Sequence, residues 1–310
     1  MTSPTRTSGR RLASALALGA LALGATACSE EVPDRDQAPA SSESKATDTT
    51  SESPSTEPSE TPTDEGDTAD DTVTVPVYFT GDTPQGPRLY REFRAVPSDN
   101  PLMEAAVLLT AGDTLDPDYR TEWPGAGFAS IEVSDGLIVA ELKDDGFTSR
   151  PDGMSKRDAT LAVQQLVYTL QGVQQERVPV QVLLGGQPTS LFGLDTTEPF
   201  TAADALDVAA LVNVTTPEQG STVAGDTLEA SGVASSFEAN VPWEISIGDE
   251  VVLDGFATAE GWMDKLYPWE TSIDVSSLEP GAYRFTARTD DPADGEGGGP
   301  TEDTKEFTLE

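Results

Sequence analysis

The chain has 310 residues, of which 55 are Asp or Glu and 18 are Lys or Arg, so its formal net charge is −37. A chain this acidic lacks the basic patches that neutralise phosphates, which argues against nucleic acid as a partner. It also has no histidine, which excludes nucleophiles activated by histidine, histidine-bound zinc and imidazole bases. We therefore expect no catalytic residues, no bound metal and no cofactor.

Residues 1–28 have the parts of a bacterial lipoprotein signal. Three arginines precede an uncharged stretch from Leu12 to Ala27, and the only cysteine, Cys28, follows it. In such signals the thiol receives a diacylglycerol and the peptide is cut just before it, although Ala25 stands where leucine is commonest. We predict a signal peptide at 1–27 and a protein held on the extracytoplasmic face of the cell membrane by the lipid on Cys28 alone. An ordinary secreted protein with a free thiol is the alternative.

Residues 28–71 are predicted to form an acidic linker. Between Ser29 and Asp71 there are 14 acidic and 2 basic residues, with many Ser, Thr and Pro and few large apolar side chains. A segment with so little to bury cannot offset the entropy of ordering, so we expect a disordered, extended spacer. Its Ser and Thr residues could instead carry glycans or bind a partner, which the intact mass of the native protein would reveal.

Residues 72–190 carry the pattern of a small α+β domain. Apolar and polar residues alternate from Val73 to Thr80, Asn100 begins a helix that Gly112 ends, and Ser155 with Asp158 forms a capping box for a second helix. The other predicted elements are a strand at 89–96, a hairpin of 128–133 with 137–142, and a strand at 178–184. This order predicts an α+β fold with two helices on one face of a small mixed sheet.

Three carboxylates, Asp113, Asp116 and Asp118, lie close together in the loop at 113–127. Their spacing is not that of a calcium loop, and no glutamate follows at the required offset. We therefore interpret them as solvated turn carboxylates rather than as metal ligands.

The same region resembles the GerMN domain of spore-germination lipoproteins. The likeness covers about residues 72–188 and rests on the helix 102–109, the Trp123-Pro124-Gly125 turn, the Ser134-Asp135-Gly136 hairpin, the segment 166–170 and the strand 180–186. Known members of that family act in envelope complexes, and one is a structural part of a channel assembly during sporulation. No catalytic residues are associated with the domain, so the resemblance implies an interaction role and carries over no site residue.

Residues 191–211 are predicted to be a packed connector with a short helix at 201–211, and residues 212–310 an all-β immunoglobulin-like sandwich. Apolar residues alternate with polar ones from Val241 to Ile247, and Trp243 stands where sandwich domains bury a tryptophan. The other predicted strands are 228–232, 251–256, 271–275, 283–287 and 307–309.

The last region resembles the immunoglobulin-like domain of bacterial spore germination, which often accompanies GerMN. The residues that carry this likeness are Thr216-Pro217, Gly220-Ser221, the segment 231–234 and the segment 237–243. Two resemblances in the expected order support each other.

Three aromatic residues, Trp262, Tyr267 and Trp269, lie close together in the sandwich sequence. They could form a platform on which a wall sugar or a protein partner stacks, because aromatic side chains dominate interface anchors. The alternative is that they close one end of the sandwich core.

A second acidic loop contains Asp290, Asp291, Asp294 and Glu296. Pro292 occupies the place where a calcium loop needs a ligand, so a flexible acidic hairpin tip is the favoured interpretation.

Together these features predict a membrane-anchored, non-catalytic scaffold or interaction module of the cell envelope. Its expected partners are envelope proteins, and the membrane is reached through the lipid anchor only. The alternative function is a lipoprotein that binds cell-wall polysaccharide.

Overall fold

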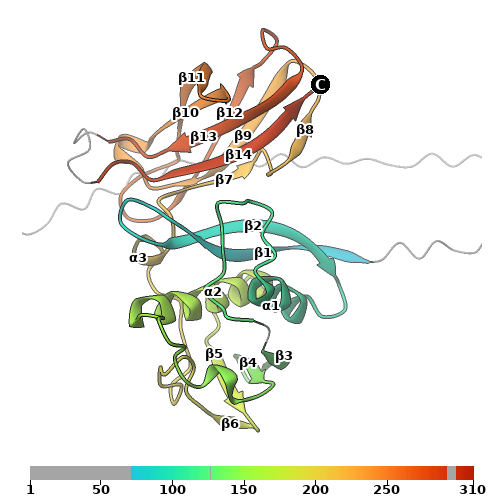
Figure 1. Ribbon diagram of the computed structural model, residues 1–310, viewed down its shortest axis with the longest axis vertical. Coiled ribbons are helices and arrows are strands. Elements are labelled where there is room, and N and C mark those ends of the chain that lie inside the picture. The colour runs from blue at the N-terminus through green and yellow to red at the C-terminus, as the bar shows by residue number, and fades with distance from the viewer. Residues whose placement is uncertain (1–70, 126, 292–297) are drawn as a thin grey trace, which may run out of the picture. The chain divides into compact units, whose positions relative to one another are not determined.

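The computed structural model describes residues 71–125, 127–291 and 298–310 (Figure 1). The predicted signal peptide, Cys28 and all but the last residue of the predicted linker lie outside these residues. The described chain builds two large hydrophobic cores, one from residues before 211 and one from residues after it, and both belong to one unit, residues 65–310.

The first core begins with a long antiparallel ribbon. Its strands are β1 (Thr72–Gly81) and β2 (Arg88–Pro97), which pair with each other along their whole length. On β1 the side chains of Val75, Val77 and Phe79 are buried, as the two-residue alternation predicts. The prediction of a strand at each place is confirmed.

Both predicted helices are present, with the caps that the sequence indicates. Helix α1 (Pro101–Ala111) is capped by the Asn100 side chain, which accepts a hydrogen bond from the Met103 backbone N–H at 3.2 Å, and Gly112 ends it with a φ of 68°. Helix α2 (Lys156–Gln174) has both hydrogen bonds of the capping box between Ser155 and Asp158.

The remaining strands before residue 190 form a four-stranded sheet. The hairpin β3 (Phe128–Ser134) and β4 (Leu137–Leu142) is confirmed, β5 (Val180–Leu184) pairs parallel to β4, and β6 (Gln187–Pro188) closes the order β3-β4-β5-β6. A short 3₁₀ helix, Asp145–Phe147, follows β4. In Figure 1, α1 and α2 lie between this sheet and the β1–β2 ribbon.

The strands therefore form two sheets, which differs from the predicted single small sheet. The polar residues of α2 explain the separation, since they bond to the β1 backbone where another strand would otherwise pair. Thr169 Oγ1 accepts from the Tyr78 N–H at 3.0 Å, and Gln165 Nε2 donates to the Tyr78 carbonyl at 3.2 Å. Both side chains are fully buried.

The connector packs against the first core. Leu191 and Phe192 are completely buried, and Gln164 of α2 holds the chain at Thr201 and Ala203 through hydrogen bonds of 3.1 and 2.8 Å. The predicted helix at 201–211 is only one turn long, α3 (Ala205–Val208).

The second core lies inside a β-sandwich. One sheet has the order β11-β10-β13-β14-β8 and the other β12-β9-β7. The strands are β7 (Val212–Thr216), β8 (Ser221–Val223), β9 (Thr227–Ala234), β10 (Asn240–Ile247), β11 (Glu250–Thr258), β12 (Tyr267–Asp274), β13 (Gly281–Arg288) and β14 (Glu302–Leu309), with a 3₁₀ turn at Phe237–Ala239. Trp243 is buried as predicted, whereas β7 and β8 had not been predicted.

Among the described residues, no helix has both the length and the apolar character needed to cross a membrane.

Candidate functional site

The three aromatic residues predicted to form a platform do not share a surface. Trp269 on β12 is only 3% exposed, and its ring stacks on Phe285 at 6.4 Å inside the sandwich core. It packs inward because β12 turns alternate side chains toward the core, so the platform interpretation is wrong for this residue. Tyr267 is partly exposed and donates a hydrogen bond of 2.7 Å to Asp264.

Trp262 does reach the surface, in the loop between β11 and β12. Its side chain is 37% exposed and meets the ring of Phe237 edge-on at 5.1 Å, and the neighbouring Met263 is 68% exposed. We call Phe237, Trp262 and Met263 the Phe237–Trp262 cluster. Exposed large apolar side chains that lie together are typical of interaction surfaces.

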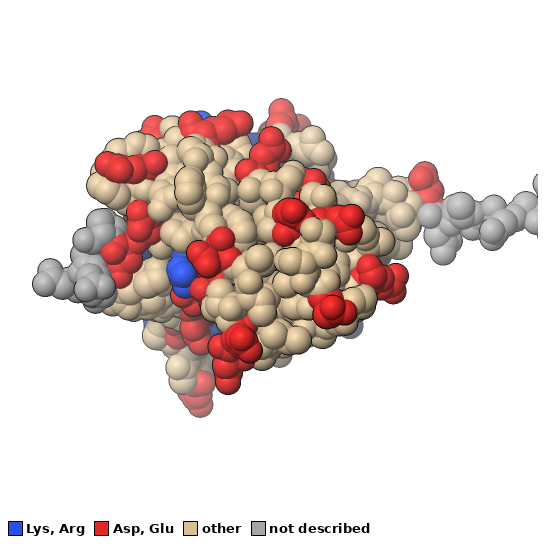
Figure 2. Space-filling view, turned by 90° about the horizontal axis from the view of Figure 1, so that it is seen from above, with Lys and Arg blue, Asp and Glu red and all other residues tan. Residues whose placement is uncertain are grey.

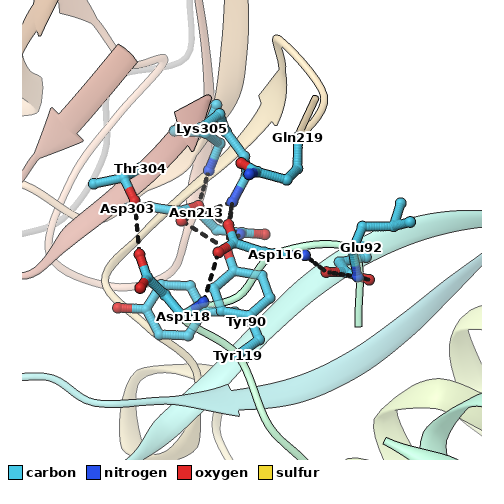
Figure 3. A network of polar contacts seen from close by, with 12 residues as sticks. Tyr90, Glu92, Asp116, Asp118, Tyr119, Asn213, Gln219, Asp303, Thr304 and Lys305 are labelled. Atoms are coloured by element: carbon cyan, nitrogen blue, oxygen red, sulfur yellow. Dashed lines mark hydrogen bonds and ion pairs between the residues drawn. The ribbon is translucent and has the colours of Figure 1, made fainter. Parts of the chain in front are cut away.

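A second site is buried, where the first core meets the sandwich. Its centre is Lys305 on β14, which is 4% exposed. The Lys305 ammonium donates to Asp116 Oδ2 at 2.6 Å, to the Tyr119 hydroxyl at 2.6 Å and to Asp303 Oδ1 at 2.9 Å (Figure 3). Asp116 and Tyr119 come from the loop after α1, so charged groups far apart in the sequence meet around one ammonium.

Further hydrogen bonds complete this network. Asp303 Oδ1 also accepts from the Tyr119 hydroxyl at 2.6 Å, and its Oδ2 accepts from Asn213 Nδ2 at 2.9 Å and from the Val214 N–H at 2.6 Å. Both carboxylate oxygens of Asp303 are thereby used. Because β7 and β14 supply these groups to a loop of the first core, the network joins the two cores directly.

The loop that carries Asp116 is itself held in place from the ribbon. Glu92 on β2 is 7% exposed and accepts hydrogen bonds from the backbone N–H groups of Leu115 and Asp116, at 3.0 and 2.9 Å. Beside it, the Tyr90 ring stacks on Tyr119 at 4.9 Å, and the Tyr90 hydroxyl donates to the Glu302 carbonyl at 2.9 Å. These contacts position the Asp116 carboxylate toward Lys305 (Figure 3).

Burial sets the electrostatics of the network. It raises the pKa of Asp116 above its ordinary value, against the opposing attraction of Lys305, and it raises the pKa of Glu92. Burial alone would lower the pKa of Lys305, but the Asp303 and Asp116 carboxylates outweigh it, so the pKa is raised. Burial, followed by the charge of Asp303, also raises the pKa of Tyr119 well above normal.

These shifts predict a loss of stability on the alkaline side. A lysine whose folded pKa is raised contributes fully below its unfolded value of 10.5 and loses this contribution as the pH rises through the folded value. The raised pKa values of Tyr119 and Tyr90 also lower the stability of the folded protein at alkaline pH, because these hydroxyls ionise near pH 10.0 only in the unfolded chain. We expect the urea midpoint to fall above about pH 10. A midpoint that stays constant to about pH 11.5 would contradict this.

The position of Asp116 corrects one sequence interpretation. It is not a solvated turn carboxylate but is 1% exposed and paired with a lysine. Asp113 pairs with Arg94 at 3.1 Å, and Asp118 accepts from Thr304 at 2.9 Å. Among the described residues, no group of three or more His, Cys, Asp or Glu side chains is placed to hold a metal ion.

The acidic loop after β13 is only partly described. Asp290 accepts a hydrogen bond from Asn240 Nδ2 at 3.2 Å, whereas Asp294 and Glu296 lie outside the described residues. Figure 2 shows Asp and Glu side chains spread over the face seen there, with very few Lys or Arg among them.

Two families match the sequence. Residues 76–190 match the family described as sporulation and spore germination, and residues 211–296 match the immunoglobulin-like domain of bacterial spore germination. These ranges correspond to the first core and to most of the sandwich. No curated protein matches the chain.

Three solved structures are similar over parts of the chain. The tandem GerMN domains of the Bacillus subtilis sporulation protein GerM share 15% identity, covering 66% of this chain and 62% of theirs, with a TM-score of 0.35. A proposed lipoprotein from Clostridium perfringens shares 17% identity over 42% of this chain and 87% of its own, with a TM-score of 0.29. CopC from Methylosinus trichosporium shares 20% identity, covering 33% of this chain and 93% of its own, with a TM-score of 0.23.

TM-scores this low do not support any conclusion about the fold or family of this chain. The family of each domain therefore follows from the two family matches alone. The chain therefore joins a GerMN domain of the sporulation and spore germination family to a C-terminal immunoglobulin-like domain of bacterial spore germination.

Proposed function

We propose that the protein is a lipid-anchored, non-catalytic scaffold of the cell envelope, which docks other envelope proteins on the extracytoplasmic side of the membrane. The observation that carries this proposal is the buried network around Lys305, which ties the GerMN domain to the immunoglobulin-like domain. The signal sequence that ends at Cys28 supports the anchor, and the absence of histidine supports a role without catalysis.

A scaffold must present its surfaces in a fixed relation, and the network supplies this. A buried charge left without its partner is costly, so any shift of the two domains that parts Lys305 from Asp116 while both stay buried is unfavourable. Every donor of the Lys305 ammonium has an acceptor in the described structure, and the acceptors come from both domains. The network therefore favours one arrangement of the two domains over other arrangements that would bury a similar apolar area.

The Phe237–Trp262 cluster is the surface that we assign to a protein partner. Trp262 and Met263 lie in a loop beyond the end of β11, and Phe237 supports the tryptophan ring from a separate turn. Rigid aromatic side chains that are already held in place lose little entropy on binding, which suits them as anchors. The exposed Trp262 ring is also the one observation that favours the alternative function, binding of cell-wall polysaccharide.

The test is crosslinking of the mature protein in cells, comparing the wild type with the double variant Trp262→Ala/Met263→Ala. We expect crosslinked envelope proteins to decrease at least about fivefold in the variant, because the anchor side chains are removed. The control is Leu115→Ala, since Leu115 is 48% exposed in the GerMN domain and lies outside the cluster.

Two outcomes would contradict these proposals. Recovery of the same partners at the same yield from wild type and double variant would overturn the assignment of the Phe237–Trp262 cluster as the docking surface. The scaffold function itself would be overturned by a second outcome, in which no protein is crosslinked in cells and the purified protein sediments with protein-free cell wall in a manner that the double variant loses. The second outcome would establish the polysaccharide alternative instead.

A further inference from the structure

A groove of about 290 Å³ lies where the two domains meet, on the side of the connector. Tyr78 and Tyr168 form part of its wall on the GerMN side, and Lys265 belongs to the loop before β12 of the sandwich. Arg91 and Arg177 complete its charged lining. A second hollow of about 140 Å³ on the GerMN domain is also lined by Tyr78, Tyr168 and Arg177.

The three cations of this groove have no carboxylate partner within salt-bridge distance among the described residues. Arg91 instead donates to Thr215 Oγ1 at 3.3 Å and lies 4.6 Å from the centre of the Phe93 ring. Arg177 lies 5.3 Å from the centre of the Tyr168 ring, and Lys265 lies 4.6 Å from that of Tyr267. In addition, the Nε atom of Arg91 is buried without an acceptor in the described structure.

Such a gathering is unexpected in a chain with 55 acidic and 18 basic residues. Elsewhere in the described structure, five cations pair with carboxylates, namely Arg94, Arg120, Arg284, Arg288 and Lys305, whereas Arg88, Lys143, Arg150, Lys156 and Arg157 do not. What sets the groove apart is that three cations without a carboxylate partner line one hollow between the domains. Around the groove, Glu176 lines the adjoining hollow and Asp204 lies near enough to Tyr168 to affect its pKa, yet neither pairs with the three cations. Three like charges that repel one another leave a local positive potential, which an anion would neutralise.

We propose that this groove binds a sugar or polyol that carries a phosphate group, either as a free molecule or as the repeating unit of a phosphodiester polymer. A guanidinium presents a planar set of donors that matches phosphate oxygens, and two arginines line the groove together with a lysine. The tyrosine rings offer the faces and hydroxyls that suit a sugar or polyol. Its volume fits one such unit rather than a folded partner. This site goes beyond the scaffold function and does not depend on it.

The groove is also connected to the buried network. Asn213, which lines the groove, accepts a hydrogen bond from the Arg91 backbone N–H at 3.3 Å and donates to Asp303 at 2.9 Å. A bound phosphate would thus lie next to the contacts that hold the two domains together. We expect binding to raise the stability of the whole folded protein, since the ligand fits only the docked arrangement.

The experiment is isothermal titration of the mature chain with sn-glycerol 3-phosphate and, separately, with short poly(glycerol phosphate). The test variant is Arg177→Gln/Lys265→Gln, because both side chains are exposed and neither supports the fold through an ion pair. The control variant is Arg150→Gln/Lys143→Gln, which removes the same two charges outside the groove. We expect the test variant to lose at least about tenfold in affinity and the control to remain within about twofold.

Binding of both probes identifies the single phosphate unit as the ligand, and binding of the polymer alone identifies the repeating unit, provided that the groove variant loses it. The proposal is overturned if neither probe saturates the wild type by about 10 mM, or if the groove and control variants bind equally. The latter result would mean that the probes respond only to net charge. Neither result affects the crosslinking test of the scaffold function.

Discussion

Replacing Lys305 by methionine is expected to lower the free energy of unfolding by about 3–5 kcal/mol. Methionine nearly fills the same volume but leaves Asp116 and Asp303 facing each other in a buried site, at 1% and 3% exposure. Tyr119 and Asn213 would still donate to Asp303, but the Asp116 Oδ2 atom would lose the hydrogen bond and ion pair that it makes with Lys305 in the described structure. Urea denaturation near neutral pH measures this loss, which is a large fraction of the total stability of a typical protein.

The matched control is the exposed ion pair between Arg284 and Glu306, which lies on the same sheet at 2.8 Å. Both side chains are about half exposed, so Arg284→Met is expected to cost less than about 1 kcal/mol. A triple variant that adds Asp116→Asn and Asp303→Asn to Lys305→Met removes the stranded charges and is expected to recover part of the loss. Equal effects of Lys305→Met and Arg284→Met would show that the buried network does not hold the domains together.

The elements that could be predicted from the sequence are those specified by neighbouring residues. The alternation from Val73 to Thr80, the Asn100 cap and the Ser155–Asp158 capping box all act over fewer than ten residues, and all three are present. The Asp135-Gly136 turn likewise joins β3 to β4 as expected. Local signals of this kind do not depend on where the rest of the chain lies.

The features that could not be predicted depend on contacts between distant residues. Lys305 is 189 positions away from Asp116, and no local pattern distinguishes a paired carboxylate from a solvated one. The separation into two sheets likewise depends on Thr169 and Gln165 of α2, whose side chains bond to β1 some 90 residues earlier. Trp262 and Trp269 illustrate the same limit, because their closeness in sequence does not indicate which one faces the core.

The candidate groove could be predicted from the sequence only in part, because it depends on contacts between distant residues. The charge imbalance is visible in the sequence, but the gathering of Arg91, Arg177 and Lys265 is not, since they come from a ribbon strand, a turn after α2 and a sandwich loop. No signal in the sequence indicates this gathering, because each of the three cations has an acidic residue directly beside it, namely Glu92, Glu176 and Asp264. Arg91 has Glu92 beside it in the sequence, and only the strand geometry turns the two side chains to opposite faces.

Replacing Trp123 by alanine is expected to destabilise the GerMN domain by about 3–5 kcal/mol. The indole is 4% exposed and lies within 6 Å, centre to centre, of the rings of Phe128, Phe147 and Phe192. These residues come from β3, the 3₁₀ turn and the connector, so the cavity would be lined by segments that the tryptophan holds together. Its N–H group also donates to the Ala162 carbonyl of α2 at 2.9 Å.

Two further variants separate packing from hydrogen bonding in this cluster. Trp123→Phe keeps a ring among the phenylalanines but removes the N–H donor, and we expect it to cost about 1–3 kcal/mol. Trp262→Ala removes an indole that is 37% exposed, so its cost should stay below about 1 kcal/mol. If Trp123→Ala proved no more costly than Trp262→Ala, the connector would not depend on this cluster. Since residues 191–211 lead directly into β7 and Asn213, the same result would leave the docking of the two domains to the direct contacts between them, including the buried network around Lys305.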